Sequence, residues 1–256
     1  MTSPWNPDQY HRFRDERSKP FYDLLGLVEP CPGGTAIDLG CGTGELTRDM
    51  HAKTQVKTTL GLDSSETMLA KSAGQAGNGL TFEQGDITKF DGEFDIVFSN
   101  AALQWINGHE ELIPAIAEHV KAGGQLAFQV PANADHPSHL VAHAVAREEP
   151  FATALKGYSR EWPVLPPERY AEILDGLGFG ELTVRLEVYG HHLESTDGVV
   201  EWVKGSLLTD YERRMPAELF EQYLARYRER LLAELGMRSP YFYAFKRVLA
   251  RGRKAA

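Results

Sequence analysis

Cysteine is scarce in this chain of 256 residues, and no apolar run reaches the length that spans a bilayer. The two cysteines, Cys31 and Cys41, are too few for a disulfide framework, so we expect a reduced, cytoplasmic setting. Residues 1–17 are polar and contain no apolar core of the kind that a signal peptide has. We therefore expect no membrane partner.

Positive charge is also in short supply, with 27 Lys and Arg against 36 Asp and Glu and a net charge of −9. This balance argues against a nucleic-acid partner. Residues 201–256 reverse it, with 12 basic and 7 acidic residues. We interpret that excess as a solvated helix face, and the alternative is that some of these cations line a pocket for an anionic acceptor. The histidines and cysteines show no metal-ligand spacing, so we expect no metal.

Strand and helix signals alternate over the first 130 residues, which is typical of an α/β protein with a doubly wound parallel sheet. A helix is predicted over His109–Val120. Strands are predicted at 35–40, 58–63, 80–85, 94–100, 124–130, 182–189 and 241–250, which would complete a seven-stranded sheet. Helices are expected at 196–236, where an apolar stripe at helical spacing predicts packing against the sheet. That stripe is Leu219, Phe220, Tyr223, Leu224, Tyr227, Leu231, Leu232 and Leu235.

The stretch from Ala36 to Thr47 reads as a buried strand, a glycine turn and the start of a helix. Glycines at alternate positions let the backbone approach a ligand closely. A dinucleotide site would have its third glycine at position 45, where this chain has Glu45, and Asp38 lies before the turn. Carboxylates repel a pyrophosphate and attract an ammonium or sulfonium group. The turn therefore favours S-adenosylmethionine over a nicotinamide dinucleotide, and a dehydrogenase is the weaker interpretation.

Further polar residues follow at the ends of later predicted strands, in the order Asp63, Asp86 and Asn100. With the glycine turn, this series resembles class I S-adenosylmethionine-dependent methyltransferases. The resemblance implies a Rossmann-like seven-stranded sheet whose last strand is antiparallel, with a helical insertion, and S-adenosylmethionine as cofactor. The cofactor-binding residues it implies are Asp38, Gly40, Cys41, Gly42, Gly44, Asp63, Ser64, Met68, Gly85, Asp86, Ile87 and Asn100.

The segment after the fourth predicted strand, Ala101–Trp105, offers an amide and an indole but no general base. Together with residues 5–20, Pro137–His139 and Glu201–Val203, it is similar to the trans-aconitate 2-methyltransferase family. That resemblance implies a small acidic substrate, esterified by attack of one of its own carboxylate oxygens. We therefore expect positioning residues and no catalytic base. We also expect the protein to be a monomer.

The expected substrate-binding residues are Tyr10, Arg17, Gln104, Trp105, His139 and Tyr170. Three alternatives stay open: a surface ion pair for Arg17, core packing for Trp105 and a structural role for His139. We expect one methyltransferase domain, with an N-terminal helical lid segment at 1–30, a sheet core at 31–195 and 237–256, and a helical cap at 196–236. Two other functions remain open, a methyltransferase for another small oxygen, nitrogen or carbon acceptor, and a non-catalytic cofactor-binding protein.

Overall fold

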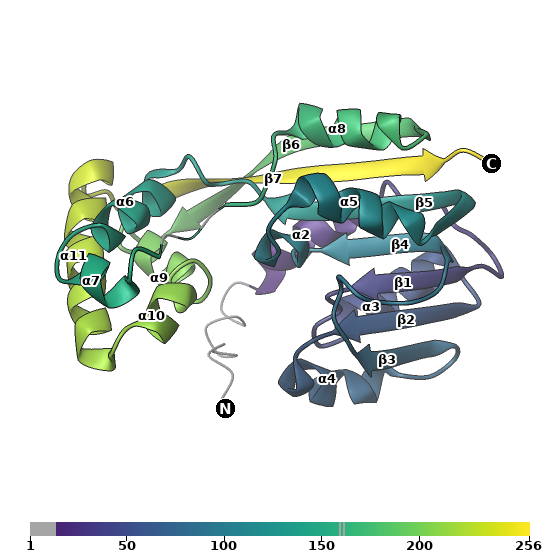
Figure 1. Cartoon of the computed structure of the whole chain (residues 1–256), viewed down its shortest axis with the longest axis horizontal. Coiled ribbons are helices and arrows are strands. Elements are labelled where there is room, and N and C mark those ends of the chain that lie inside the picture. Colours follow the sequence, from purple (N-terminus) through teal and green to yellow (C-terminus); the bar gives the residue numbers. More distant parts are fainter. Residues whose placement is uncertain (1–13, 159, 161) are drawn as a thin grey trace. The chain divides into compact units, whose positions relative to one another are not determined.

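The computed structural model describes residues 14–158, 160 and 162–256 (Figure 1). They form two compact units, which we call the sheet unit and the helical unit. The sheet unit consists of Asp15–Ala132, Pro163–Glu187 and Arg247–Ala256. The helical unit is built from Asn133–Trp162 and Val188–Lys246. The chain passes from one unit to the other within two of its strands, β6 (Phe179–Leu193) and β7 (Tyr241–Lys254).

The sheet has seven strands in the order β3-β2-β1-β4-β5-β7-β6. Strands β1 to β5 pair in parallel, and β7 pairs antiparallel with β5, as predicted. These five strands are β1 (Thr35–Leu39), β2 (Thr58–Asp63), β3 (Leu80–Gln84), β4 (Phe94–Asn100) and β5 (Val120–Pro131). The connecting helices are α2 (Arg14–Leu25), α3 (Glu45–Thr54), α4 (Glu66–Ser72), α5 (His109–Glu118) and α8 (Pro167–Gly176), with short 3₁₀ turns η1 (Ala73–Gln75) and η2 (Leu103–Trp105).

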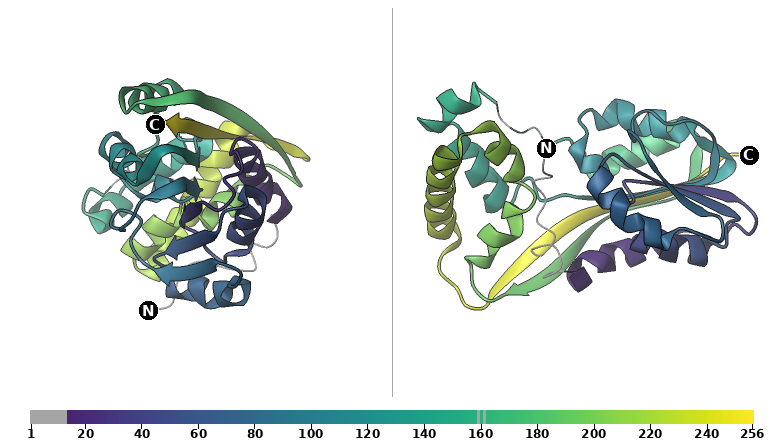
Figure 2. Two further views of the ribbon diagram at one scale, coloured as in Figure 1. Left: turned by 90° about the vertical axis from the view of Figure 1, so that its right-hand side faces the viewer. Right: turned by 90° about the horizontal axis from the view of Figure 1, so that it is seen from below.

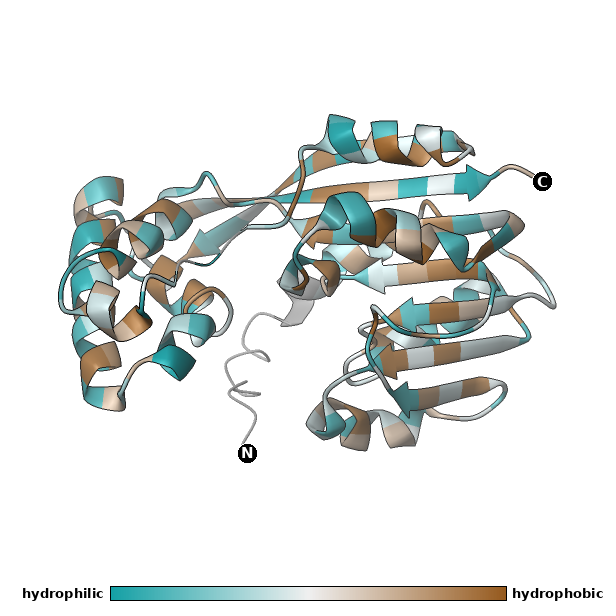
Figure 3. Cartoon of the chain, in the orientation of Figure 1, coloured by the Kyte–Doolittle hydropathy of each residue, from teal (hydrophilic) through white to brown (hydrophobic). Residues whose placement is uncertain are grey.

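Successive side chains of each strand point to opposite sides of the sheet, and the apolar ones give the sheet two faces that helices cover. Helices α5 and α8 cover one face, and α2 and α3 cover the other (Figure 2). The face under α5 and α8 is filled by a mostly aliphatic cluster that includes Ile37, Leu39, Val97, Leu126 and Val130. Figure 3 shows the apolar middle of the central strands and the hydrophilic C-terminal end of β7.

The segment predicted as an N-terminal lid is a packed element where the structure describes it. Helix α2 buries Phe21, Leu24 and Leu25, and the Phe21 ring meets the Phe98 ring edge-on at 5.4 Å between centroids. Because Phe98 belongs to β4, this helix is part of the sheet unit's own core. Residues 1–13, including Tyr10, lie outside the described residues.

The helical unit is larger than the insertion predicted at 196–236. It contains the expected helices α9 (Gly198–Lys204), α10 (Thr209–Arg214) and α11 (Ala217–Leu235), together with α6 (Pro137–Ala146) and α7 (Phe151–Leu155). The stripe on α11 packs against α6 rather than only against the sheet, as the tyrosine bonds show. Tyr223 donates to the Ala142 carbonyl at 2.9 Å and Tyr227 to the Ser138 carbonyl at 3.0 Å.

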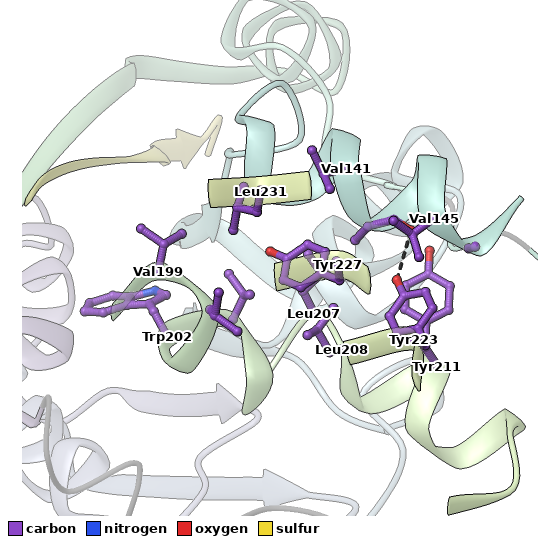
Figure 4. Packing of buried hydrophobic residues seen from close by; sticks show 14 of the residues in the cluster. Val141, Val145, Val199, Trp202, Leu207, Leu208, Tyr211, Tyr223, Tyr227 and Leu231 are labelled. Carbon is purple, nitrogen blue, oxygen red and sulfur yellow. Dashed lines mark hydrogen bonds between the residues drawn. The ribbon is translucent and has the colours of Figure 1, made fainter. Parts of the chain in front are cut away.

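An aromatic cluster forms the core of the helical unit (Figure 4). Its buried rings are Phe151, Trp202, Tyr211, Phe220, Tyr223, Tyr227, Tyr241, Tyr243 and Phe245. Valine and leucine side chains such as Val141, Val145 and Leu231 fill the spaces between them. Among the described residues, no helix combines the length and the apolar character needed to cross a membrane.

Candidate cofactor and acceptor site

The turn between β1 and α3 is a glycine loop whose backbone only glycine adopts easily. Gly40, Gly42 and Gly44 have φ values of 83°, 58° and 76°, in the left-handed region. A Cβ on Gly40 would lie 2.2 Å from the Cβ of Ala102, and one on Gly44 would lie 2.5 Å from the Phe82 ring. The loop is therefore in close contact with Ala102, in the segment that follows β4, and there is no room for a side chain at Gly40 or Gly44.

Asp63, the last residue of β2, ties this loop to the start of α4. Its Oδ2 accepts from the Gly42 N–H at 2.9 Å, and its Oδ1 accepts from the Ser65 N–H at 2.8 Å. Each carboxylate oxygen has a second lone pair, so both remain able to accept from a ligand hydroxyl. Gly85, which follows β3, lies next to Asp63, because its N–H donates to the Asp63 carbonyl at 3.0 Å.

Asp38 is the buried acid of the site, with only 3% of its surface exposed. Thr47 on α3 donates to its Oδ2 at 2.6 Å, whereas Oδ1 has no hydrogen-bond partner among the described residues. Burial raises the pKa of Asp38 to about 7, the Thr47 bond opposes that rise, and the charge of Asp63 adds to it. A buried carboxylate oxygen of this kind suits a ligand that brings a cation or an N–H group.

Cys41 and Met68 line the same loop. Burial raises the pKa of the Cys41 thiol, and the charges of Asp38 and Asp63 raise it further, so the thiol stays neutral. The Met68 methyl lies 3.1 Å from where a Cβ on Gly42 would be. Ser64 is exposed beside them, and its carbonyl accepts from Gln84 Nε2 at 3.1 Å.

Asp86 follows β3 at the same edge of the sheet. Its Oδ1 accepts from the Thr88 N–H at 2.9 Å and from the Thr88 hydroxyl at 2.7 Å, and these bonds hold the pKa of Asp86 below its usual range. The side chain is exposed and ionised. Ile87 is half-buried and packs against the aliphatic cluster.

Two polar residues lie at the end of β4 and just after it. Asn100 accepts from Gln129 Nε2 at 2.8 Å through its Oδ1. Gln104, in η2, is buried and donates to the Ala101 carbonyl at 2.6 Å, while its Oε1 has no partner among the described residues. Trp105 beside it is 51% exposed. Neither an amide nor an indole takes up a proton at neutral pH, so this segment positions ligands without acting as a base.

Comparison with known proteins agrees with this geometry. The methyltransferase domain family matches residues 37–128, which contain the glycine loop and the strand-end acids. A trans-aconitate 2-methyltransferase of Deinococcus radiodurans is 46% identical over 251 residues, covering 96% of each chain. One from Sinorhizobium fredii is 38% identical and covers 89% of each chain. This chain belongs to the trans-aconitate 2-methyltransferase family.

Solved structures share the fold. The YcgJ protein of Bacillus subtilis superposes with a TM-score of 0.60 at 13% identity, covering 93% of this chain and 99% of its own. As a member of its family, the chain is an S-adenosylmethionine-dependent methyltransferase. The residues present fit that cofactor, because Gly40 and Gly44 leave the loop backbone without side chains at these positions and Asp38 keeps a buried oxygen for a cationic group.

The predicted cofactor-binding residues come together at one edge of the sheet, at the carboxyl ends of β1 to β4. Parallel strands end at the same edge, so acids at successive strand ends become neighbours in space. The contacts described above link Asp63 directly to Gly42 and Gly85, and Asp38 to Thr47. Which of these residues touch the bound cofactor stays a prediction.

The predicted substrate-binding residues that the structure describes belong to both units. Gln104 and Trp105 lie beside the glycine loop, and the side chain of Arg17, on α2, is outside what the structure describes. Tyr170 is completely buried in α8, and its hydroxyl contacts a ring nitrogen of His109 and accepts from the Leu165 N–H at 3.1 Å. These contacts give Tyr170 a packing role in the sheet unit, and its part in acceptor binding stays a prediction.

His139 follows the fifth strand in the chain and lies on α6, in the helical unit. Its Nδ1 is 3.1 Å from the Ser138 hydroxyl, and its ring meets the Trp162 ring edge-on at 4.9 Å. Burial lowers the pKa of His139 to about 3, with nearby His136 and Arg160 adding to the effect. A neutral, buried imidazole fits the structural alternative, and a role in acceptor binding remains untested.

Sequence reasoning missed Gln129 and Arg247, which form a polar chain with Asn100. Arg247 Nη1 donates to Gln129 Oε1 at 3.1 Å. The available signal was a glutamine within an otherwise apolar strand, since a buried polar side chain requires a partner. The partner, in β7, is more than a hundred residues away in the sequence and was not identifiable from it.

Proposed function

We propose that this chain transfers the methyl group of S-adenosylmethionine to a carboxylate of trans-aconitate, which forms a monomethyl ester. The observation that carries the proposal is the 46% identity to a trans-aconitate 2-methyltransferase over 96% of both chains. A match of this extent includes the glycine loop, the acids at the strand ends and the helical unit. It therefore supports a shared acceptor as well as a shared cofactor.

The chain's residues are suited to hold the donor without reacting with it. Asp63 offers two oxygens for ribose hydroxyls, and Asp38 offers one buried oxygen for the ammonium end. When bound, S-adenosylmethionine supplies a methyl group on a positively charged sulfur. The carboxylates of Asp38, Asp63 and Asp86 make this edge of the sheet favourable for that charge.

The acceptor segment is consistent with a nucleophile that needs no deprotonation. A carboxylate is already ionised at neutral pH, and its oxygen attacks the methyl carbon while the carbon–sulfur electron pair stays with sulfur. No proton moves in that step. Gln104 and Trp105, an amide and an indole beside the glycine loop, would orient the acceptor and shield the reacting atoms from water.

Methyl-labelled S-adenosylmethionine provides the test. We expect label to enter trans-aconitate, and alkali to release it as methanol, because an ester hydrolyses. Tricarballylate, the saturated analogue, serves as the matched control for recognition of the planar acid. Label that alkali does not release would overturn the ester, and binding of the donor with no transfer to trans-aconitate would overturn the acceptor.

We also propose that the enzyme is a monomer, as its size suggests, and that it works in the cytoplasm, as its cysteine content suggests. Light scattering during chromatography checks the monomeric state, and a mass twice that of one 28.6 kDa chain would contradict it.

A further inference from the structure

Strand β5 carries two buried glutamines on one face, Gln125 and Gln129, each paired with an arginine of β7. Gln125 Oε1 accepts from Arg251 Nη2 at 2.9 Å, and Gln129 Oε1 accepts from Arg247 Nη1 at 3.1 Å. In the β5–β7 ladder, Arg251 is opposite Ala127 and Arg247 is opposite Pro131. Each arginine therefore stands two positions beyond its glutamine, and the same arrangement occurs twice.

The two arrangements differ in what the glutamine nitrogen reaches. Gln125 Nε2 donates to the Glu29 carbonyl at 3.0 Å, and the Glu29 N–H donates back to Gln125 Oε1 at 2.9 Å. That pair fixes a backbone segment at the amino end of β4. Gln129 Nε2 instead donates to the Asn100 Oδ1 at 2.8 Å, at the carboxyl end of the same strand.

The arginine sets the direction of this second chain. A guanidinium only donates hydrogen bonds, so the atom of Gln129 that faces Arg247 is its oxygen. The Gln129 nitrogen must then face Asn100, and Asn100 must meet it with its own oxygen. The Asn100 Nδ2 is consequently left to donate, and no acceptor for it is found among the described residues.

Asn100 lies where a ligand is expected. It is the last residue of β4, and Ala102, two residues later, is the residue that would collide with a Cβ on Gly40 of the glycine loop. The amide nitrogen of Asn100 therefore lies at the edge of the sheet that carries Asp38 and Asp63. In open sheets of this type, ligands bind outside the carboxyl ends of the strands.

We propose that Arg247 and Gln129 are positioning residues that hold the Asn100 amide as a hydrogen-bond donor to a ligand carboxylate. The carboxylate belongs either to the methionyl end of the donor or to the acceptor, and this choice rests on the proposed function. Arg247 is 6% exposed and Gln129 is 1% exposed, so both act through Asn100.

Gln129→Glu is the decisive variant. The new carboxylate still pairs with Arg247, but it accepts from Asn100 rather than donating to it. The Asn100 amide then turns and presents its oxygen to the ligand carboxylate. We expect the affinity for that ligand to fall by about 10- to 100-fold, because a charge-assisted bond is replaced by a repulsive contact. Asn100→Asp removes the donor directly and is expected to cause a similar loss.

Gln125→Glu is the matched control, with the same change on the same face of the same strand. A carboxylate cannot donate to the Glu29 carbonyl, so this variant is expected to lower the unfolding temperature and leave ligand affinity unchanged. Arg247→Lys keeps a donor for the Gln129 oxygen and is expected to retain most of the affinity.

Two measurements distinguish the source of the carboxylate. Calorimetric titration of S-adenosylmethionine reports the methionyl carboxylate, and the KM for trans-aconitate at saturating donor reports the acceptor. A weaker S-adenosylmethionine affinity or a higher KM for trans-aconitate in Gln129→Glu, with both values unchanged in Gln125→Glu, supports the proposal. If neither the affinity nor the KM changes in Gln129→Glu, the proposal is overturned. If the unmodified protein does not methylate trans-aconitate, the proposed function fails, and the donor titration alone decides whether Arg247 and Gln129 act on the site.

Discussion

The two cores of this protein are built from different side chains and treat polarity differently. The aliphatic cluster of the sheet unit contains mainly leucine, isoleucine and valine, and Asp38 and Gln104 each hold a buried oxygen at the carboxyl ends of its strands. The aromatic cluster of the helical unit contains polar hydroxyls within it. Those of Tyr223 and Tyr227 donate to carbonyls of α6. These tyrosine hydroxyls therefore serve packing, whereas Asp38 and Gln104 keep oxygens available for a ligand.

Two buried oxygens at the sheet edge differ from these tyrosine hydroxyls because they have no partner among the described residues. In the helical unit, the buried atom of this kind is a nitrogen, Trp162 Nε1. Asp38 Oδ1 and Gln104 Oε1 are buried acceptors without a partner among the described residues. The tyrosine hydroxyls have backbone partners instead. A buried polar atom without a partner costs free energy, so its persistence at the sheet edge indicates that a ligand completes it.

The largest effect is expected from a substitution within the aromatic cluster of the helical unit. Phe220 is 3% exposed and stacks against Tyr223 at 6.1 Å between ring centroids. Phe220→Ala is expected to lower the free energy of unfolding by about 3–5 kcal/mol, because it removes a buried ring and leaves a cavity. Denaturant titration measures that change. Donor affinity of the folded protein should stay the same, and a parallel loss of affinity would contradict the division of roles between the two cores.

Removing Asp63, which joins the glycine loop to the start of α4, is expected to have the next largest effect. Here donor affinity, rather than the free energy of unfolding, is the property expected to fall. Asp63→Ala deletes both acceptors for the N–H groups of Gly42 and Ser65, as well as the oxygens offered to the ribose. We expect S-adenosylmethionine affinity to fall by about 100-fold, at roughly 1–3 kcal/mol for each lost charge-assisted bond. Asp49→Ala is the control, because Asp49 is a half-buried acid on α3 whose carboxylate accepts from the Tyr22 hydroxyl at 2.7 Å. A loss of less than about threefold by calorimetry would refute the role of Asp63.

Most of the sheet edge could be predicted from the sequence, and the reason is topological. Asp38, Asp63 and Asp86 end or follow successive parallel strands, so alternation of strands and helices was enough to bring them together. The contacts that the sequence could not predict depend on long-range packing. Tyr170 is buried against His109, and Arg247 reaches Gln129 only through the antiparallel register of β7. No local pattern in the sequence specifies that register.

Protonation of Asp38 is expected to have an intermediate effect. Its pKa is raised from 3.8 to about 7, so between these values the folded state holds a proton that the unfolded state has lost. The free energy of unfolding should therefore fall as the pH rises from about 4 to about 7, through this group. Asp38→Asn, measured by denaturant titration across that range, should remove this part of the pH dependence.

The affinity for S-adenosylmethionine should change with pH in the opposite direction, because a cationic donor favours the ionised form of Asp38. S-adenosylmethionine affinity is expected to rise by up to about tenfold per pH unit below the pKa of Asp38, with release of a proton. Asp86→Asn is the matched control, since the pKa of Asp86 is lowered and that group stays ionised. If Asp38→Asn keeps the pH dependence, another group is responsible for it.

The smallest expected effect concerns a single hydroxyl within the aromatic cluster. Tyr223→Phe keeps the ring and removes only the bond to the Ala142 carbonyl, which lies inside α6 where main-chain bonds also satisfy carbonyls. We expect a loss of about 1 kcal/mol in the free energy of unfolding and no change in donor or acceptor kinetics. Tyr227→Phe, which loses the equivalent bond to Ser138, should behave alike. If either variant instead raised the KM for the acceptor while its stability held, a tyrosine hydroxyl would be acting on a ligand. The helical unit's buried polarity would then be functional, as it is at the sheet edge.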